Sequence, residues 1–211
     1  MSINENSYPI KTRINIRTFM KKYHSVLPDD LFVELEKASW NGRWAIITTS
    51  TIIELDKRLS ERKAKDKKLS TCAKLNNLGK EYEADGKLSL AIKTYEKNIT
   101  GDCYPATYSF DRLMVLYRKR KDYVNEIRVI SKAIKVFTTE NERRAQKAIK
   151  EYPDKEKQIR AALETCTNVK GALRSTLTGA VLYCFCPYPV NKYKQRLEKA
   201  RALQAKQSQT K

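Results

Sequence analysis

The feature that most constrains the fold is an apolar pattern of helical spacing that recurs after 35 residues in the middle of the chain. Each copy has the spacing i, i+3, i+4, i+7, which places its residues on one face of an α-helix. The first copy consists of Leu75, Leu78, Gly79 and Tyr82, and the second of Phe110, Leu113, Met114 and Tyr117. A period of this length indicates stacked supersecondary units. With only 6 Gly and 6 Pro in 211 residues, a turn-rich β-sandwich or barrel is disfavoured.

The residues that follow each copy complete a pattern known from a repeat family. Ala91 and Tyr95 follow the first copy, and Ile130 and Ala133 follow the second. Together these segments, about residues 72–137, resemble tetratricopeptide repeats, whose pattern is W-x2-L-G-x2-Y, then A-x3-F, then P, over about 34 residues. The resemblance implies antiparallel helical hairpins that stack into a short solenoid. An ordinary helical bundle shares this periodicity and is the alternative.

Single residues match or depart from the family pattern in ways that predict the packing. The small residues at 79 and 91 are expected to let the two helices of the first hairpin approach closely, and Gly86 falls in the turn between them. The second segment has Met114 where the family has Gly and Glu126 where it has a small residue. We therefore expect looser helix packing in the second hairpin than in the first.

A degenerate third hairpin, to about residue 170, and a capping helix are expected after the two repeats. The T-x-x-E sequence at Thr139 has the form of a capping box that begins a helix, with a turn at Tyr152-Pro153-Asp154 and a second helix over residues 155–170. Residues 190–206 are amphipathic, and their apolar stripe predicts a helix that caps the last hairpin. A basic helical face laid on nucleic acid or membrane is the alternative for this segment. The stripe consists of Tyr193, Leu197, Ala200 and Leu203.

The first 68 residues are predicted to form a helical lobe of unknown function. A helix that follows Pro28 should end at Asn41-Gly42, and a second helix is expected from Arg43 onward. A strand through residues 45–53 is the alternative, because Thr48 to Thr51 are poor helix formers. Residues 61–68 are almost wholly charged and form either an exposed helix end or a linker.

The expected fold is therefore all-α, a short tetratricopeptide-like solenoid of antiparallel helical hairpins with an N-terminal helical lobe and a C-terminal capping helix. Residues 1–68 form the lobe and residues 69–138 the two repeats. Residues 139–206 form the third hairpin and the cap, and residues 207–211 a frayed tail.

Neither the cysteines nor the single histidine indicates a catalytic or metal site. Five scattered cysteines fit reduced thiols in a cytoplasmic protein better than a disulfide scaffold. The closest pair, Cys184 and Cys186, lacks the spacing of zinc ligands. His24 lies in a polar stretch, and no phosphate-binding or nucleophile motif is present. We expect a protein that is not an enzyme, with no cofactor and no metal, and no membrane span, since no apolar run approaches 18 residues.

The chain carries a formal net charge of +19, and much of it lies near the C-terminus. Residues 141–211 hold 16 basic and 6 acidic residues, a balance of +10. Such a field attracts phosphates, acidic peptides or anionic surfaces. A solvated lysine-rich surface without a specific partner is the bland alternative.

The resemblance also implies a binding groove, because the first helix of each tetratricopeptide hairpin faces a concave surface where partner segments bind. Five of the seven positions that face this groove are basic here, which predicts a groove for an acidic, carboxylate-rich or phosphorylated segment of a partner protein. The positions are Asn76, Lys80, Tyr108, Arg112, Arg118, Arg143 and Lys147.

A run of four basic residues offers a second function. Arg118, Lys119, Arg120 and Lys121 close the first helix of the second repeat, where cations complement a helix C-terminus. The same run is a candidate for tracking a phosphate backbone. The expected function is non-catalytic protein–protein recognition, as an adaptor or scaffold. The alternative is a nucleic-acid- or ribosome-associated factor, while the oligomeric state is open.

Overall fold

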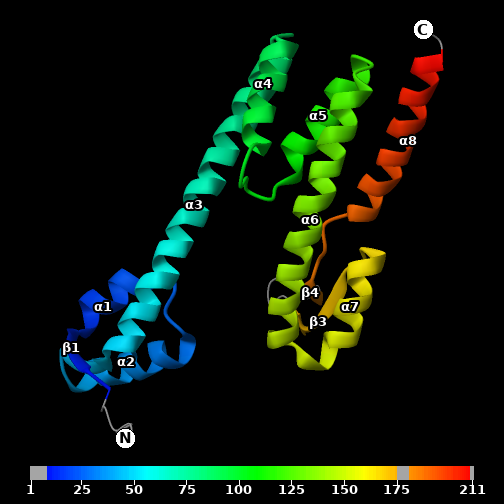
Figure 1. The fold of residues 1–211 in the computed structure, drawn as a ribbon. Coiled ribbons are helices and arrows are strands. Elements are labelled where there is room, and N and C mark those ends of the chain that lie inside the picture. The colour runs from blue at the N-terminus through cyan, green and yellow to red at the C-terminus, as the bar shows by residue number, and fades with distance from the viewer. Residues whose placement is uncertain (1–8, 175–180, 210–211) are drawn as a thin grey trace, which may run out of the picture. The chain divides into compact units, whose positions relative to one another are not determined.

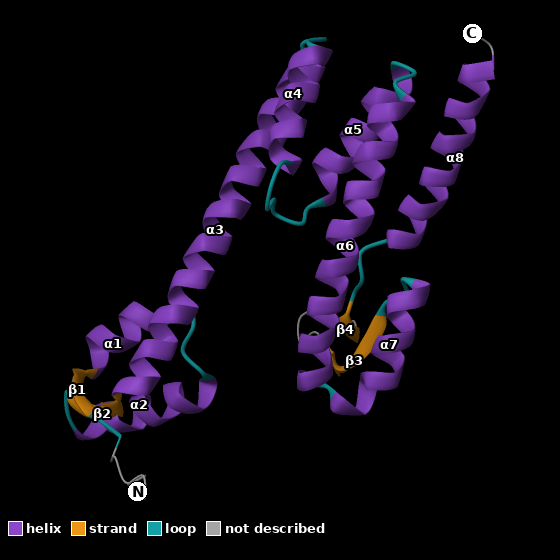
Figure 2. Ribbon diagram, viewed as in Figure 1, coloured by secondary structure: helices purple, strands orange, loops and turns teal. Residues whose placement is uncertain are grey.

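The chain is mostly helical and carries two short antiparallel sheets of two strands each (Figures 1 and 2). The computed structural model describes residues 9–174 and 181–209. The predicted helical class is thus confirmed, although the strands add to it. Two compact units are present, residues 1–70 and 71–211. A single helix, α3 (Thr49–Ala84), contributes residues to both units.

The first unit packs three helical segments and a two-stranded antiparallel sheet around one core. Antiparallel pairing of β1 and β2 places Ile14 and Ile47 on the buried face of the sheet. Asn15 caps α1, since its side chain accepts a hydrogen bond from the Thr18 amide at 3.1 Å. Leu35 of α2 and Leu55 of α3 complete the core. The elements are β1 (Lys11–Asn15), α1 (Ile16–Tyr23), α2 (Asp29–Asn41), β2 (Trp44–Thr48) and the first part of α3.

The prediction of a helix from Arg43 onward is wrong, because residues 44–48 form strand β2 and α3 begins only at Thr49. Gly42 ends α2, as predicted, and continues in an extended conformation. Successive residues of β2 are alternately exposed and covered, which is the period of a strand. The strand alternative for this region was therefore the better prediction. The charged stretch 61–68 is neither a helix end nor a linker, since it lies inside α3.

In the second unit, a row of helices packs in chain order and α8 returns onto α6 (Figures 1 and 2). Helix α4 contacts α5, α5 contacts α6, and α6 contacts both α7 and α8. The main core includes Phe110, Leu113, Val129 and Phe137, none of which is exposed to solvent. The elements after α3 are α4 (Leu88–Ile99), α5 (Thr107–Lys119), α6 (Tyr123–Glu151), a 3-10 turn (Pro153–Lys155), α7 (Glu156–Thr165), β3 (Val169–Arg174), β4 (Val181–Phe185) and α8 (Val190–Gln209).

The close approach predicted at position 79 is confirmed. A Cβ atom added to Gly79 would lie 2.2 Å from Cε1 of Tyr95, so α3 and α4 approach over the tyrosine ring as only a glycine allows. Tyr95 and Ala91 are fully buried on α4. Gly86, between the two helices, has a φ of 71°, a backbone conformation that glycine adopts without strain.

Two predicted boundaries of the third hairpin are wrong. The capping box at Thr139 begins no helix, because α6 runs unbroken from Tyr123 to Glu151 and contains neither Gly nor Pro. Helix α7 ends at Thr165 and not at residue 170. Cys166 ends it in the left-handed conformation, at a φ of 56°, and strand β3 follows. The turn at residues 152–154 is present, and α7 packs back on α6.

Helix α8 has the predicted apolar stripe, with Tyr193 and Ala200 buried and Leu197 packed against the main core. Hydrogen bonds join the start of α8 to α5 and α6. Tyr193 donates to Asp111 at 3.1 Å, and the Tyr188 amide just before the helix donates to Asn141 at 2.7 Å. In the predicted frayed tail, the helix continues to Gln209, and residues 210–211 lie outside the described residues.

Candidate functional site: a lysine and tyrosine surface on α3 and α5

Three of the predicted groove residues lie together on the C-terminal part of α3 and on α5. Lys80 is exposed, and its Nζ lies 4.6 Å from the centre of the Tyr108 ring. One turn further along α5, the Nε of Arg112 donates to Glu83 of α3 at 2.9 Å, and its Nη2 donates to the other carboxylate oxygen. We call these four residues, Lys80, Glu83, Tyr108 and Arg112, the Lys80 cluster.

The charges within the Lys80 cluster are unequally balanced. The hydrogen bonds from Arg112 lower the pKa of Glu83, so this carboxylate is ionised and neutralises the guanidinium at neutral pH. Tyr95 donates to the same carboxylate at 2.8 Å, and burial raises the pKa of its hydroxyl. Lys80 has no carboxylate partner among the described residues. The cluster therefore presents one uncompensated ammonium group beside an aromatic ring.

Asn76, another predicted groove residue on α3, faces into the protein. Its carbonyl oxygen accepts hydrogen bonds from the Asn98 amide at 2.9 Å and from the Ser109 hydroxyl at 2.6 Å. Asn98 also donates to the backbone oxygen of Cys72 at 3.2 Å. Asn76 thus joins α3, α4 and α5 in a buried polar network and is not free to bind a partner.

The remaining predicted groove cations are paired with carboxylates of their own. Arg118 donates to a carboxylate on α6, and the other two form pairs within α6. The three pairs are Arg118–Glu126 at 2.8 Å, Arg143–Glu140 at 2.6 Å and Lys147–Glu151 at 3.5 Å. Four of the five basic groove positions therefore have a carboxylate partner, and Lys80 is the one that has none among the described residues.

Only the first residue of the basic run at the end of α5 is paired with a carboxylate of the described residues. Arg118 is bound to Glu126, while Nη2 of Arg120 donates to the Ser89 hydroxyl at 3.0 Å. Lys121 lies in the turn before α6 with a φ of 57°. Lys119, Arg120 and Lys121 are exposed, and a role of this run in phosphate binding stays a prediction.

Glu126 has a structural role that the sequence pattern did not reveal. It is fully buried at the start of α6, where its carboxylate accepts from Arg118 of α5 at 2.8 Å and from Arg196 of α8 at 3.2 Å. The residue that departs from the small amino acid of the repeat pattern is thus the carboxylate that fastens α8. Two arginines that count toward the positive charge are used for this contact.

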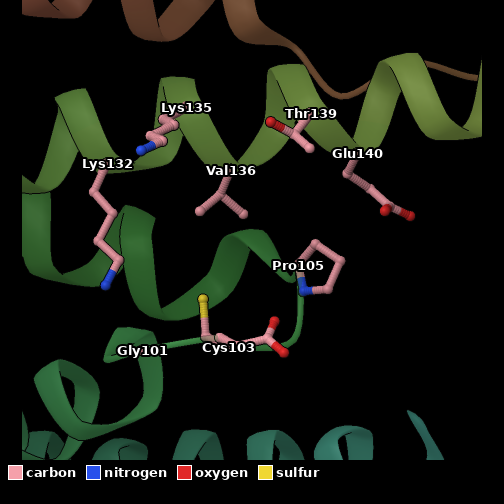
Figure 3. A pocket seen from close by; sticks show the side chains of 9 residues that line it. Gly101, Cys103, Pro105, Lys132, Lys135, Val136, Thr139 and Glu140 are labelled. Carbon is pink, nitrogen blue, oxygen red and sulfur yellow. The ribbon is translucent and has the colours of Figure 1, made fainter.

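A cavity of about 380 Å³ lies between the loop after α4 and the outer side of α6 (Figure 3). Cys103 points into it from the loop, and Lys132 extends from α6 toward that loop. Burial raises the pKa of the Cys103 thiol, so the group is protonated at neutral pH and is a poor nucleophile. The cavity is large enough for a small molecule or a side chain.

Within residues 9–174 and 181–209, no group of three or more His, Cys, Asp or Glu side chains is arranged to hold a metal ion. No helix within these residues is both long enough and apolar enough to cross a membrane. Comparisons of the chain with protein-family models, with curated proteins and with solved structures found no match.

Proposed function

We propose that the second unit is a non-catalytic module that binds a segment of a partner protein, with the Lys80 cluster receiving a carboxylate of that segment. The observation that carries this proposal is the state of Lys80, an exposed ammonium without a carboxylate partner, held over the Tyr108 ring. A contact with the face of an aromatic ring restrains a lysine without engaging its hydrogen-bond donors. Those donors remain available for a carboxylate, and the tyrosine ring offers apolar surface beside it.

The pairing of the other cations defines what kind of segment is recognised. Because four of the five basic groove positions already have carboxylate partners, Lys80 is the one left for a partner carboxylate, and a long acidic stretch gains little from these positions. A segment with one or two carboxylates and apolar neighbours fits better. The proposed partner is therefore moderately acidic. The free thiols at all five cysteines support a reducing compartment, and we propose the cytoplasm.

Peptide binding tests this function directly. An array of nine-residue fluorescent peptides carries Glu at its central position among apolar and small residues, with a matched array that carries Gln. The intact protein should bind members of the Glu array more tightly than their Gln counterparts. Lys80→Gln should weaken that binding by roughly 10- to 150-fold, the usual value of a charge-assisted hydrogen bond of 1.5–3 kcal/mol.

Lys147→Gln is the matched control, because it removes the same charge from an exposed lysine outside the Lys80 cluster. It should leave the affinity for the Glu array unchanged. Equal losses in Lys80→Gln and Lys147→Gln, or no preference of the intact protein for Glu over Gln, would refute the assignment of the Lys80 cluster.

A further inference from the structure

The outer face of the β1–β2 sheet in the first unit combines cationic and aromatic side chains. Alternate residues of the two strands share this face, because side chains along a strand point to opposite sides. The buried face carries Ile14 and Ile47. The outer face carries Lys11, Arg13 and Asn15 of β1 opposite Thr48, Ile46 and Trp44 of β2. None of these six residues is acidic.

The two strands divide this face into a cationic side and an apolar side. Lys11 and Arg13 are exposed on β1, two residues and about 7 Å apart along the strand. Trp44 and Ile46 are 52% and 68% exposed on β2, which is unusual for side chains of this size. The guanidinium of Arg13 lies 4.7 Å from the centre of the Trp44 ring, so one face of the indole is covered and the residue is held in place.

The cations of this face, like Lys80 of the second unit, have no carboxylate partner among the described residues. Lys11 and Arg13 form no ion pair with any carboxylate of the described residues, and neither do Arg17 at the start of α1 and Arg43 immediately before β2. Unpaired cations on a surface without acidic residues retain their full attraction for phosphate groups. This holds although the whole first unit has a smaller charge excess than the C-terminal third.

We propose that this outer face binds single-stranded nucleic acid, with Lys11 and Arg13 contacting the phosphate backbone and a base stacked on Trp44. A single strand has phosphates along one side and bases along the other. The phosphates match the cationic side of the sheet and the bases match its apolar side. Exposed aromatic rings in a basic surface are the general means by which proteins bind unpaired bases without sequence preference. The site is independent of the Lys80 cluster.

The observations favour a single strand over two other anionic partners. In a duplex the bases are stacked and inaccessible to Trp44, so only the phosphate contacts remain. A membrane surface is also anionic and accepts tryptophan at its interface. In this sheet, however, the Trp44 indole lies against Arg13. This contact restrains the ring beside the sheet and leaves it available as a flat stacking surface.

Fluorescence anisotropy with a 5′-fluorescein-labelled single-stranded rU12 tests the proposal on the full chain. Binding should weaken as salt is raised, with a slope of log K against log salt of about −0.7 per phosphate contact. The double substitution Lys11→Gln and Arg13→Gln should make this slope less steep by about 1.4. Lys93→Gln with Lys97→Gln removes the same charge from exposed positions on α4 of the second unit and should leave the slope unchanged.

Tryptophan fluorescence separates base stacking from charge attraction. The chain has two tryptophans, so Trp40→Phe leaves Trp44 as the only indole. Its emission should be quenched on addition of rU12. Trp44→Leu keeps an apolar side chain on β2 and should weaken rU12 binding roughly 5- to 150-fold, the usual range for one stacked base. Far-ultraviolet circular dichroism of each variant establishes that it is folded.

Four results would overturn the proposal. These are no binding of rU12 at low salt, binding that leaves Trp44 emission unchanged, an equal effect of the two charge substitutions, or tighter binding of a 12-base-pair duplex than of rU12. Vesicles of phosphatidylcholine and phosphatidylserine test the membrane alternative. A blue shift of Trp44 emission with these vesicles and no quenching with rU12 would assign the face to a membrane surface.

Discussion

Gly79→Ala tests the packing on which the second unit depends. On a freely exposed helix this substitution stabilises by about 1 kcal/mol, because alanine is the better helix former. Here the new Cβ would lie 2.2 Å from Cε1, 2.5 Å from Cζ and 2.8 Å from Cδ1 of Tyr95. Carbon atoms in contact lie about 3.5 Å apart, so the ring or the helix must move by about 1.3 Å.

The surroundings of Tyr95 make this movement costly. The ring is fully buried, its hydroxyl is bound to Glu83, and the Tyr108 ring packs against it at 6.0 Å. Overpacking a tight core costs about 1–3 kcal/mol, and an overlap of this size belongs at the upper end. Subtracting the gain in helix propensity leaves a net destabilisation of about 2 kcal/mol. The melting temperature of a unit of this size should fall by about 4–8 °C.

Urea unfolding followed by circular dichroism at 222 nm measures this change, with two single substitutions as controls. Gly42→Ala places its Cβ where no atom lies within 4 Å and should alter stability by less than about 0.5 kcal/mol. Asn77→Ala lies in the same helix at an exposed position and should stabilise slightly. In a Tyr95→Leu background the Gly79→Ala penalty should shrink, since the overlapping ring is gone. A Gly79→Ala protein as stable as the unsubstituted chain would refute the close approach of α3 and α4.

Three further changes test other contacts of the second unit. Glu126→Gln removes the buried carboxylate shared by Arg118 and Arg196 and should lower the free energy of unfolding by about 3 kcal/mol. This is the lower end of the range for buried ion pairs, because both arginines are partly exposed. Hydrogen exchange should detect the loss as faster amide exchange throughout α8. The pKa of Glu83 is lowered by Arg112, so its contribution to stability is present above the ordinary glutamate pKa and is lost as pH falls through the lowered one. Glu83→Gln should therefore flatten the acid limb of the unfolding free energy below the ordinary glutamate pKa. Burial raises the pKa of the Cys103 thiol, and the charge of Lys132 opposes this rise. Alkylation of Cys103 by iodoacetamide at pH 8, followed by mass spectrometry, should therefore be slower in the folded protein than in the unfolded chain. It should be slower still in Lys132→Gln.

Helical periodicity in the sequence predicted the helices that bury one apolar stripe. The spacing around Gly79 predicted the α3–α4 contact, and the stripe through Tyr193 and Ala200 predicted α8 and its buried side. In both cases the determining residues lie close together in the sequence, so a local pattern carries the information. The ends of α2 and the turn near Pro153 were predictable for the same reason, because their signals are single residues.

The incorrect predictions concern residues whose local preferences are overridden by distant partners. Residues 44–48 are compatible with helix or strand, and pairing with β1, some thirty residues earlier, decides for the strand. Thr139 has the sequence of a helix start, yet α6 passes through it because its neighbours on both sides are buried against α5, α7 and α8. A capping motif indicates a helix start only where the preceding residues are not already helical.

The candidate sites show why a charge count alone does not locate a binding surface. Some pairs that neutralise the predicted groove can be expected from the sequence, since Arg143 and Glu140 are three residues apart on one helix. The pair of Arg112 with Glu83 spans 29 residues and depends on the packing of α5 against α3. Such pairs remove arginines and lysines from the surface charge without changing the net charge of +19. What attracts an anionic partner is the set of cations left without carboxylates. Lys80 and Arg13 belong to that set, and each also lies against an aromatic ring, so the two proposed sites follow from the pairing and the ring contacts together and not from the total charge.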